Sequence, residues 1–241
     1  MNTIIFDLDG TLLPMEQDAF EDTFYKSLHH YFQGLGYESE ALKNALENGM
    51  TAMLENNGFQ SNREAFETVI DTAYGKKASK FFRDYKKYFR KDFDIARLNT
   101  RPIPDAPNCI RTLQTKGYSL VLASSPFLPE EAILKELDWA GLSRHDFLYI
   151  ATYENSCYAK TNLQFYRSLP KKIGRTPGDC LVVGNDVAED MCAVAVGFDV
   201  FLIKDCLVNR KELDYCDCKQ GSFGSFLEYV DELPVASEAD S

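Results

Sequence analysis

The chain has 241 residues and a formal net charge of −11 at pH 7, and 45% of its residues are hydrophobic and 26% charged. These values are ordinary for a soluble globular protein with one large domain or two smaller ones, either of which can bury a substantial core. The acidic balance argues against nucleic acid and against anionic membranes as partners.

The sequence gives no indication of export or membrane insertion. The first apolar run, residues 1–6, has no basic leader. Other apolar runs, such as 120–123, are far shorter than the roughly 20 residues that cross a bilayer. The 7 cysteines are scattered and odd in number, which indicates reduced thiols. We therefore expect a cytoplasmic protein, and Cys216 and Cys218 lack the second pair that a zinc site needs.

A single strand opens the chain and a helical stretch follows it. We expect a short apolar strand at 3–6 and a break at 7–11. From about residue 15 to residue 93, apolar residues recur every three or four positions, which is typical of helices. Further helices in this stretch are expected at 39–56, 62–74 and 79–90.

From residue 104 onward, strands and helices alternate with short connections, which predicts a parallel sheet covered on both faces. The predicted fold class is therefore α/β. A Rossmann-like three-layer core would comprise residues 1–14 and 100–241, and an all-helical cap domain would be inserted at residues 15–99. The expected helices lie at 106–116, 130–139, 163–173 and 188–196, and the expected strands at 118–123, 147–151, 180–183 and 200–203.

Two carboxylates follow the first expected strand. Residues two apart in an extended chain point to the same side, so Asp7 and Asp9 can face one site. That site would lie at the carboxyl end of the strand, where open parallel sheets bind their ligands. Gly10 permits a sharp exit from the strand. An Asp-rich turn without further function is the alternative for this segment.

A second acidic pair follows the expected strand at 180–183. Asp186 and Asp190 share a face at the start of a helix, where they could also simply complement the helix dipole. Together with Asp7 and Asp9, they place up to four carboxylates at the ends of two strands. Like charges so close raise each other's pKa unless a cation compensates, and an all-oxygen site favours Mg²⁺ over zinc.

Two further strand ends offer groups suited to an anion. The strand at 118–123 ends in Ser124 and Ser125, and the strand at 147–151 is followed by Lys160. A lone Ser-Ser pair is ordinary in a turn, and a lone lysine is ordinary on a surface. Their order along the chain, each just past a strand and between the two acidic pairs, favours a common site.

The sequence resembles the haloacid dehalogenase superfamily in its phosphatase branch. The first motif, Asp7-Leu8-Asp9-Gly10-Thr11, is highly specific when it follows an N-terminal strand. The inserted helices match the family's cap by position. The resemblance covers roughly residues 1–14 and 97–233. The matching residues are Asp7-Leu8-Asp9-Gly10-Thr11, then Ser124, then Lys160, then Gly184-Asn185-Asp186 with Asp190.

The resemblance implies roles for most of these residues. Asp7 would attack phosphorus and become an aspartyl-phosphate, and Asp9 would protonate the leaving alkoxide and then activate water. Mg²⁺ would be held by Asp7, the main-chain carbonyl of Asp9 and Asp186, with Asp190 as a ligand directly or through water. The phosphate-binding residues would be Leu8, Thr11, Ser124, Ser125 and Lys160, of which Lys160 would also orient Asp7.

The implied activity is Mg²⁺-dependent hydrolysis of a small phosphate monoester, because the superfamily's dehalogenases lack the acid that Asp9 provides. A sugar phosphomutase of the same superfamily and a non-catalytic binding protein on this fold stay as alternatives. The chain departs from the family's frequent pattern at Ser125, where Asn is common, and at Thr161, where Pro is common.

The segment 76–91 holds eight basic residues and one acidic residue. Its aromatic residues recur at helical spacing, which predicts an amphipathic cap helix with the aromatics inside. A basic face that steers a phosphorylated metabolite, or a contact with nucleic acid, are the alternatives. A cap over the site would exclude large substrates, so we expect a small phosphorylated metabolite as the partner. We take a monomer as the default.

Overall fold

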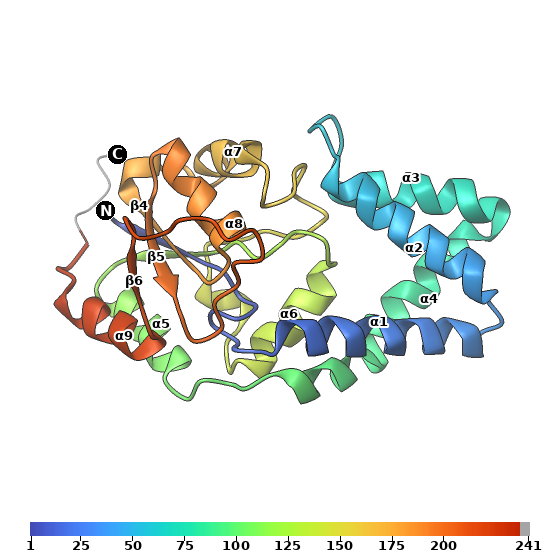
Figure 1. The fold of residues 1–241 in the computed structure, drawn as a ribbon, viewed down its shortest axis with the longest axis horizontal. Helices are drawn as coiled ribbons and strands as arrows, with labels where there is room; N and C mark the ends of the chain where they lie inside the picture. The colour runs from blue at the N-terminus through green and yellow to red at the C-terminus, as the bar shows by residue number, and fades with distance from the viewer. Residues whose placement is uncertain (237–241) are drawn as a thin grey trace.

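The computed structural model describes residues 1–236. Figure 1 shows a sheet with its covering helices at one end of the molecule and a helical region, residues 15–99, at the other. The predicted α/β fold is confirmed, while the domain boundaries next to residues 15 and 99 stay predictions. No helix within residues 1–236 is both long and apolar enough to cross a membrane.

The sheet has the strand order β3-β2-β1-β4-β5-β6, and every neighbouring pair is parallel. The N-terminal strand is therefore central, and the strand order reverses there, because β2 and β4 lie on opposite sides of it. The strands are β1 (Thr3–Phe6), β2 (Ser119–Leu122), β3 (Tyr149–Ile150), β4 (Cys180–Gly184), β5 (Asp199–Ile203) and β6 (Lys219–Gly221).

Alternation along the strands divides the core between the two faces of the sheet. Ile4 and Phe6 belong to one apolar cluster, and Ile5 belongs to the other. The helices on the first face are α5 (Ala106–Thr115), α6 (Glu130–Trp139) and α9 (Phe223–Glu232), and those on the second are α7 (Leu163–Ile173) and the 3₁₀ segment η5 (Met191–Val196). These are the three layers that the sequence predicted.

The helical region packs around aromatic side chains. Its elements are α1 (Gln17–Gly34), α2 (Ser39–Leu54), α3 (Asn62–Tyr74), α4 (Ala78–Lys91) and the 3₁₀ segments η1 (Gly75–Lys77) and η2 (Phe93–Asn99). Phe24 contacts Phe93, whose ring centroid lies 5.1 Å from that of Trp139 on α6. The apolar interior of the helical region therefore continues into the cluster on the first face of the sheet.

The basic segment forms the predicted amphipathic helix. Phe81, Tyr85, Tyr88 and Phe89 of α4 are buried. On the outer side of the helix, Lys86 and Arg90 pair with Glu131 of α6 at 2.6 and 3.5 Å. Part of the basic face is thus used to join the helical region to the sheet's helices.

Some elements differ from the sequence prediction. The helix expected at 188–196 is divided into a short α8 (Val187–Asp190) and the 3₁₀ segment η5, and Gly197 ends it with a φ of +98°. Neither β6 nor α9 was expected from the sequence. The strand β6 is only Lys-Gln-Gly, which has no apolar alternation to reveal it, whereas α9 does have buried residues at helical spacing, namely Phe223, Phe226 and Val230.

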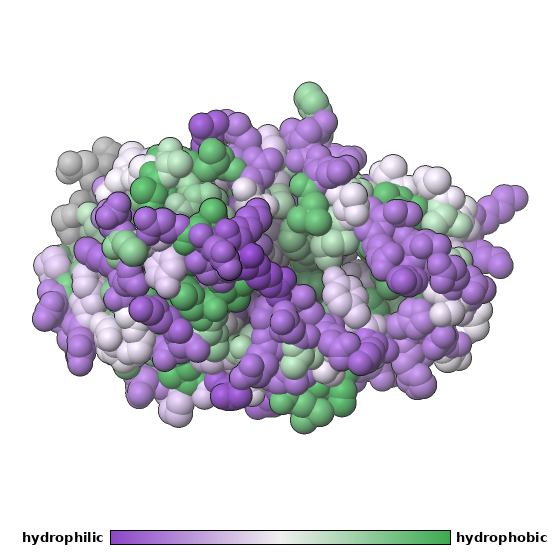
Figure 2. Space-filling model, in the orientation of Figure 1, coloured by the Kyte–Doolittle hydropathy of each residue, from purple (hydrophilic) through white to green (hydrophobic). Residues whose placement is uncertain are grey.

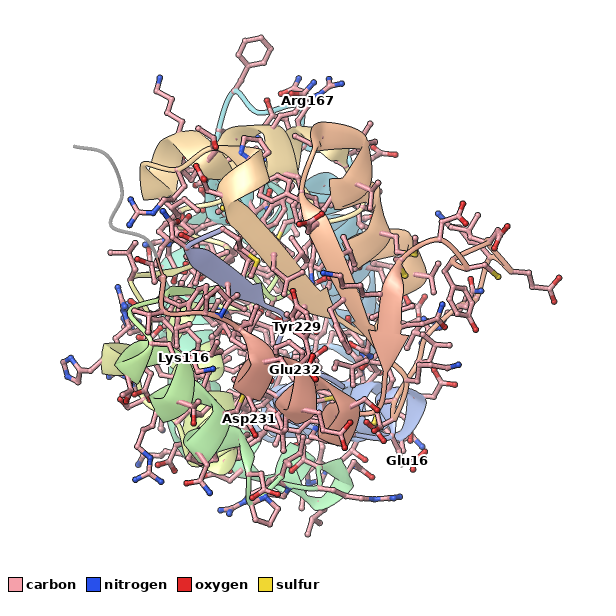
Figure 3. All side chains as sticks on the ribbon, turned by 90° about the vertical axis from the view of Figure 1, so that its left-hand side faces the viewer. Glu16, Lys116, Arg167, Tyr229, Asp231 and Glu232 are labelled. Atoms are coloured by element: carbon pink, nitrogen blue, oxygen red, sulfur yellow. The ribbon has the colours of Figure 1, made fainter. Side chains whose placement is uncertain are left out.

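The helix α9 is held at its C-terminal end by α5. The Lys116 ammonium, at the end of α5, donates to the carbonyl oxygens of Val230, Asp231 and Leu233 at 2.7–2.8 Å, and Figure 3 shows Lys116 beside this end of α9. A cation at a helix C-terminus satisfies free carbonyls and complements the helix dipole. This contact fixes the last helix against the first face of the sheet.

Candidate active site

Asp7 directly follows the central strand of the sheet. The strand β1 is buried along its whole length, and the Asp7 N–H extends its ladder by donating to the Val183 carbonyl oxygen at 2.8 Å. The strand order reverses at β1, and such a switch point is where open parallel sheets bind ligands. The fold therefore places Asp7 at the edge of the sheet where the sequence predicted a site.

The loop after Asp7 is fastened to the loop after β4. Gly10 has a φ of +82°, and a Cβ at this position would lie 2.2 Å from Nδ2 of Asn185, so a side chain does not fit there. The Thr11 hydroxyl donates to Oδ1 of Asn185 at 3.0 Å, and Nδ2 of Asn185 donates to the Cys206 carbonyl oxygen at 2.7 Å. Asn185, for which the sequence predicted no role, thus joins the two carboxylate-bearing loops.

Lys160 connects carboxylates from the two acidic segments. It lies between β3 and α7, is 1% exposed, and places Nζ 2.6 Å from Oδ1 of Asp7 and 2.6 Å from Oδ1 of Asp190. Burial lowers the pKa of Lys160, but Asp190 and Asp7 outweigh burial and raise it well above its ordinary value. Lys160 is therefore a buried cation that fixes one oxygen of Asp7.

Asp7 and Asp9 both lie where a negative charge is unfavourable. Burial raises the pKa of Asp7 well above its ordinary value; Lys160 opposes this, while Asp190 and Asp9 add to it. Burial also raises the pKa of Asp9 to about 7, with Lys160 opposing and Glu189 adding. Oδ1 of Asp9 is buried and has no hydrogen-bond partner among residues 1–236. Crowded carboxylates with an unpartnered oxygen can accept a further cation.

Asp186 and Asp190 follow β4 as predicted, but their carboxylates have different partners. Oδ1 of Asp186 accepts the N–H groups of Ala188 and Glu189 at 2.7 and 3.0 Å, at the start of α8. Oδ2 of Asp190 accepts the Asp186 N–H at 2.9 Å, while Oδ1 contacts Lys160. Both oxygens of Asp190 are thus engaged in positioning Lys160 and the Asp186 loop. Its role as a metal ligand stays a prediction.

Ser124 and Ser125 follow β2, opposite the acidic segment of β4. Ser124 is buried and lines the cavity next to the carboxylates. The Ser125 hydroxyl donates to Oε2 of Glu189, and burial raises the pKa of this glutamate. Glu189 was not among the residues predicted from the sequence. Its position between the two predicted carboxylates of the 186–190 segment was the available signal.

Part of the predicted set of residues lines one cavity, and Asp190 is not among the lining residues. Asp7, Asp9, Ser124 and Asp186 line a cavity of about 380 Å³, whose opposite wall comes from α1 and α2. Figure 2 shows the hollow between the two parts of the molecule, with apolar side chains inside it. Lys160 lies behind Asp7 rather than in the wall of the cavity. The helical region therefore closes over the carboxyl edge of the sheet.

Leu8 and Thr11 are not among the described residues that line this cavity. The Leu8 side chain lies in the apolar core, and the Thr11 hydroxyl is bonded to Asn185. The Thr11 N–H also donates to the Leu8 carbonyl oxygen at 3.1 Å, so neither donor of Thr11 points to a ligand. Phosphate binding by Leu8 and by Thr11 stays a prediction.

The residues at the cavity fit a divalent metal ion. Within residues 1–236, no three His, Cys, Asp or Glu side chains gather closely enough to hold a metal by themselves, the pair Cys216 and Cys218 included. Mg²⁺ usually keeps several waters and takes only one or two carboxylates. The carboxylates of Asp7 and Asp186 with the main-chain oxygen of Asp9 are such a set. The raised pKa of Asp7 and the unpartnered oxygen of Asp9 also fit an added cation.

A sequence profile of haloacid dehalogenase-like hydrolases matches residues 1–196. The chain belongs to the haloacid dehalogenase-like hydrolase family. This confirms the resemblance seen in the motifs and identifies the protein as a hydrolase. The family generally uses a divalent metal, in agreement with the donor set described above.

Individual members of the family are similar to this hydrolase over most of their length. It is 26% identical over 194 residues to the phosphoglycolate phosphatase of Aquifex aeolicus, a match that covers 78% of each protein. A predicted phosphoglycolate phosphatase from Haemophilus somnus has a TM-score of 0.58 at 19% identity, over 95% of this chain and 97% of that one. A Thermotoga maritima protein described as a β-phosphoglucomutase has a TM-score of 0.58 at 16% identity, over 97% and 100%. At such identities the two structures show the fold alone.

Proposed function

We propose that this hydrolase is a phosphatase that cleaves a small phosphate monoester through an aspartyl-phosphate on Asp7. The observation that supports this most directly is the placement of Asp7 at the switch point of the sheet, with one oxygen held by Lys160 at 2.6 Å. The second oxygen is then left to act as the nucleophile. Asp9 and Ser124 line the same cavity, where an acid and an anion-binding hydroxyl are needed.

In the first displacement, the free oxygen of Asp7 forms a bond to phosphorus while the ester P–O bond breaks. The departing alkoxide takes the proton of the Asp9 carboxyl and leaves as the alcohol. Lys160 and the Ser124 hydroxyl would stabilise the charge on the phosphoryl oxygens, since phosphoryl transfer depends mostly on positioning and electrostatics.

In the second displacement, water attacks the phosphorus of the aspartyl-phosphate. The Asp9 carboxylate takes a proton from this water as the bond between phosphorus and Asp7 breaks. Inorganic phosphate leaves, Asp7 regains its carboxylate, and Asp9 is again protonated. One acid/base group can thus serve both steps, because the second step reverses its direction of proton transfer.

The metal is proposed to be Mg²⁺, held by the carboxylates of Asp7 and Asp186 and by the main-chain oxygen of Asp9. When bound, it would neutralise the charge of the phosphoryl group and so allow an anionic nucleophile to approach. The Ser125 hydroxyl donates a hydrogen bond to Glu189, so the proposed contribution of Ser125 to phosphate binding is through its main chain.

The proposal is tested by measuring phosphate release from a panel of small phosphate esters, with Mg²⁺ and with a chelator. Asp7→Asn removes the nucleophile and should abolish release, whereas Asp22→Asn makes the same chemical change on the exposed side of α1 and should have no effect. Release that persists in Asp7→Asn would overturn the proposed mechanism.

Acid-quench trapping separates hydrolysis from the alternative of a sugar phosphomutase. A phosphatase loses the phosphoryl group of Asp7 rapidly to water as inorganic phosphate. A mutase would instead retain a long-lived aspartyl-phosphate and return it to a sugar phosphate without releasing phosphate, which would contradict the proposal.

A further inference from the structure

Building on the proposed phosphatase function, we infer that the cavity selects esters of large, uncharged and mainly apolar alcohols. It would correspondingly disfavour esters whose alcohol carries a carboxylate, the class to which phosphoglycolate belongs. The walls of the cavity that face away from the catalytic carboxylates determine this selection, through their shape, apolar character and charge.

The first argument is the apolar wall that the helical region contributes. Phe20, Phe24 and Tyr25 of α1 and Met50 and Leu54 of α2 all line the cavity. Phe20 and Phe24 are buried, but Tyr25 is 43% and Leu54 is 48% exposed. Large apolar side chains left exposed next to buried ones, in a hollow, form a surface that an apolar ligand would cover. Figure 2 shows this apolar surface in the hollow.

The second argument is size. The volume of about 380 Å³ falls in the range of pockets that hold drug-sized ligands. Phe127 and Leu128, which follow Ser125, extend the apolar surface on the sheet side of the cavity. A two-carbon alcohol such as glycolate would leave most of this surface uncovered, so it would gain little from burial.

The third argument is charge. Besides the catalytic carboxylates, Glu21 and Glu189 line the cavity. Among the lining residues that the structure describes, Arg210 is the single cation, and its Nη2 lies 2.7 Å from Oδ1 of Asp18 and 4.0 Å from Oε1 of Glu21. Its charge is therefore already balanced, and a carboxylate on the alcohol would face acidic groups without a free cation to pair with.

The substrate test compares kcat/KM for ethyl, butyl and hexyl phosphate in the presence of Mg²⁺. Burial of each methylene against the wall should raise kcat/KM by about fourfold. Hexyl phosphate is also compared with 6-phosphonooxyhexanoate, which has the same length and ends in a carboxylate, and with 2-phosphoglycolate. Both carboxylated esters should be worse than hexyl phosphate by about tenfold or more.

Variants assign the selection to particular side chains. Leu54→Ala should reduce the ratio of the hexyl to the ethyl kcat/KM by about tenfold, since it removes three carbons of the wall. Leu35→Ala is the control, because Leu35 is exposed to a similar extent but is not among the lining residues. Glu21→Gln should raise kcat/KM for 6-phosphonooxyhexanoate relative to hexyl phosphate.

The outcomes separate this inference from the proposed function. If none of the esters is hydrolysed, or if Asp7→Asn hydrolyses them, both the phosphatase proposal and this inference are overturned. If hydrolysis depends on Asp7 but kcat/KM does not rise from ethyl to hexyl phosphate, the phosphatase proposal stands and this inference is wrong. The same conclusion follows if 2-phosphoglycolate is the preferred ester and Arg210→Gln removes that preference.

Discussion

Nδ2 of Asn62 donates a hydrogen bond to the carbonyl oxygen of Pro126 at 3.0 Å, although the two residues are 64 positions apart in the sequence. Asn62 begins α3 in the helical region, and Pro126 directly follows Ser125. The Asn62 N–H also donates to the Ser156 carbonyl oxygen at 2.7 Å. One fully buried asparagine therefore connects the helical region to the loop after β2 and to the loop after β3.

Asn62→Ala should destabilise the protein by about 1–3 kcal/mol, because it leaves buried polar groups without partners. The Pro126 carbonyl oxygen would lose the bond from Nδ2 of Asn62, and Nδ2 of Asn56 would lose its 2.8 Å bond to Oδ1 of Asn62 and keep only the bond to the Gln60 carbonyl oxygen. The helical region would also open more often, so we expect a higher KM. Urea unfolding and steady-state kinetics measure the two effects. Asn57→Ala, in an exposed position of the same segment, should change neither, and an equally small effect at Asn62 would disprove the role assigned to it.

The carboxylates of the site were predictable because local rules place them. Asp7 and Asp9 are two residues apart after an apolar strand, and Asp186 and Asp190 are one helical turn apart. The order of the motifs along the chain then indicated that Lys160 belongs to the same site. A parallel sheet necessarily gathers such strand ends at one edge, so the sequence sufficed to predict that these side chains lie together there, while their catalytic roles stay predictions.

The opposite side of the cavity could not be predicted in this way. The helical spacing of Phe20 and Phe24 shows that they share a face of α1, but whether that face meets the core or a cavity depends on how α1 packs against α2. The contact between Asn62 and Pro126 has no local signature either. Such features follow from tertiary packing between segments distant in the chain, which periodicity does not report.

Replacing Lys160 by methionine should destabilise the protein by about 3–5 kcal/mol at pH 8, because it leaves the buried carboxylates of Asp7 and Asp190 without their cation. The folded-state pKa of Lys160 lies above its ordinary value, so its contribution to stability is fully present at any pH below that ordinary value and is lost only in strongly alkaline solution. Urea unfolding at pH 8 measures the loss.

The same variant should lose less stability at pH 5. Lys160 of the wild type is charged at both pH values, but in the variant the unpaired carboxyl of Asp7, whose pKa burial raises, can take up a proton and become neutral. Lys171→Met, on the exposed side of α7, is the matched control and should stay close to wild type at both pH values. A destabilisation of Lys160→Met that is the same at pH 5 and pH 8 would contradict the electrostatic role of this lysine.

Glu136 of α6 is fully buried, and neither of its carboxylate oxygens has a partner in the part of the chain that the structure describes. Burial raises its pKa well above the ordinary value of 4.5, and the charges of Asp9 and Asp7 add to this. The unfolded chain releases this proton at a lower pH than the folded protein does. The free energy of unfolding therefore falls progressively as the pH rises above about 4.5.

Glu136→Met should consequently stabilise the protein by about 1–4 kcal/mol at pH 8, because it replaces a buried carboxyl by an apolar side chain of similar volume. The gain should shrink near pH 4.5, where the glutamate is half protonated even in the unfolded chain. Thermal unfolding over this pH range is the measurement, with the exposed Glu47→Met as the control. A loss of stability at pH 8 would show that Glu136 has a buried partner or function that outweighs its desolvation.

Two glycines with positive φ distinguish backbone strain from a steric conflict at the site. Gly174, at the end of α7, has a φ of +65°, and a Cβ at this position would meet no neighbouring atom within 4 Å. At Gly10, by contrast, a Cβ would lie 2.2 Å from Nδ2 of Asn185. Gly174→Ala should therefore cost only the strain of a left-handed alanine, about 1–2 kcal/mol, and should keep kcat.

Gly10→Ala carries the same strain, and it must also displace Asn185 and the adjoining carboxylate loops. Since a misplacement of about 1 Å can lower a rate by about 100-fold, we expect kcat to fall by that order in Gly10→Ala alone. Comparable kcat values for the two variants would mean that the contact between the Asp7 loop and Asn185 does not position the catalytic carboxylates.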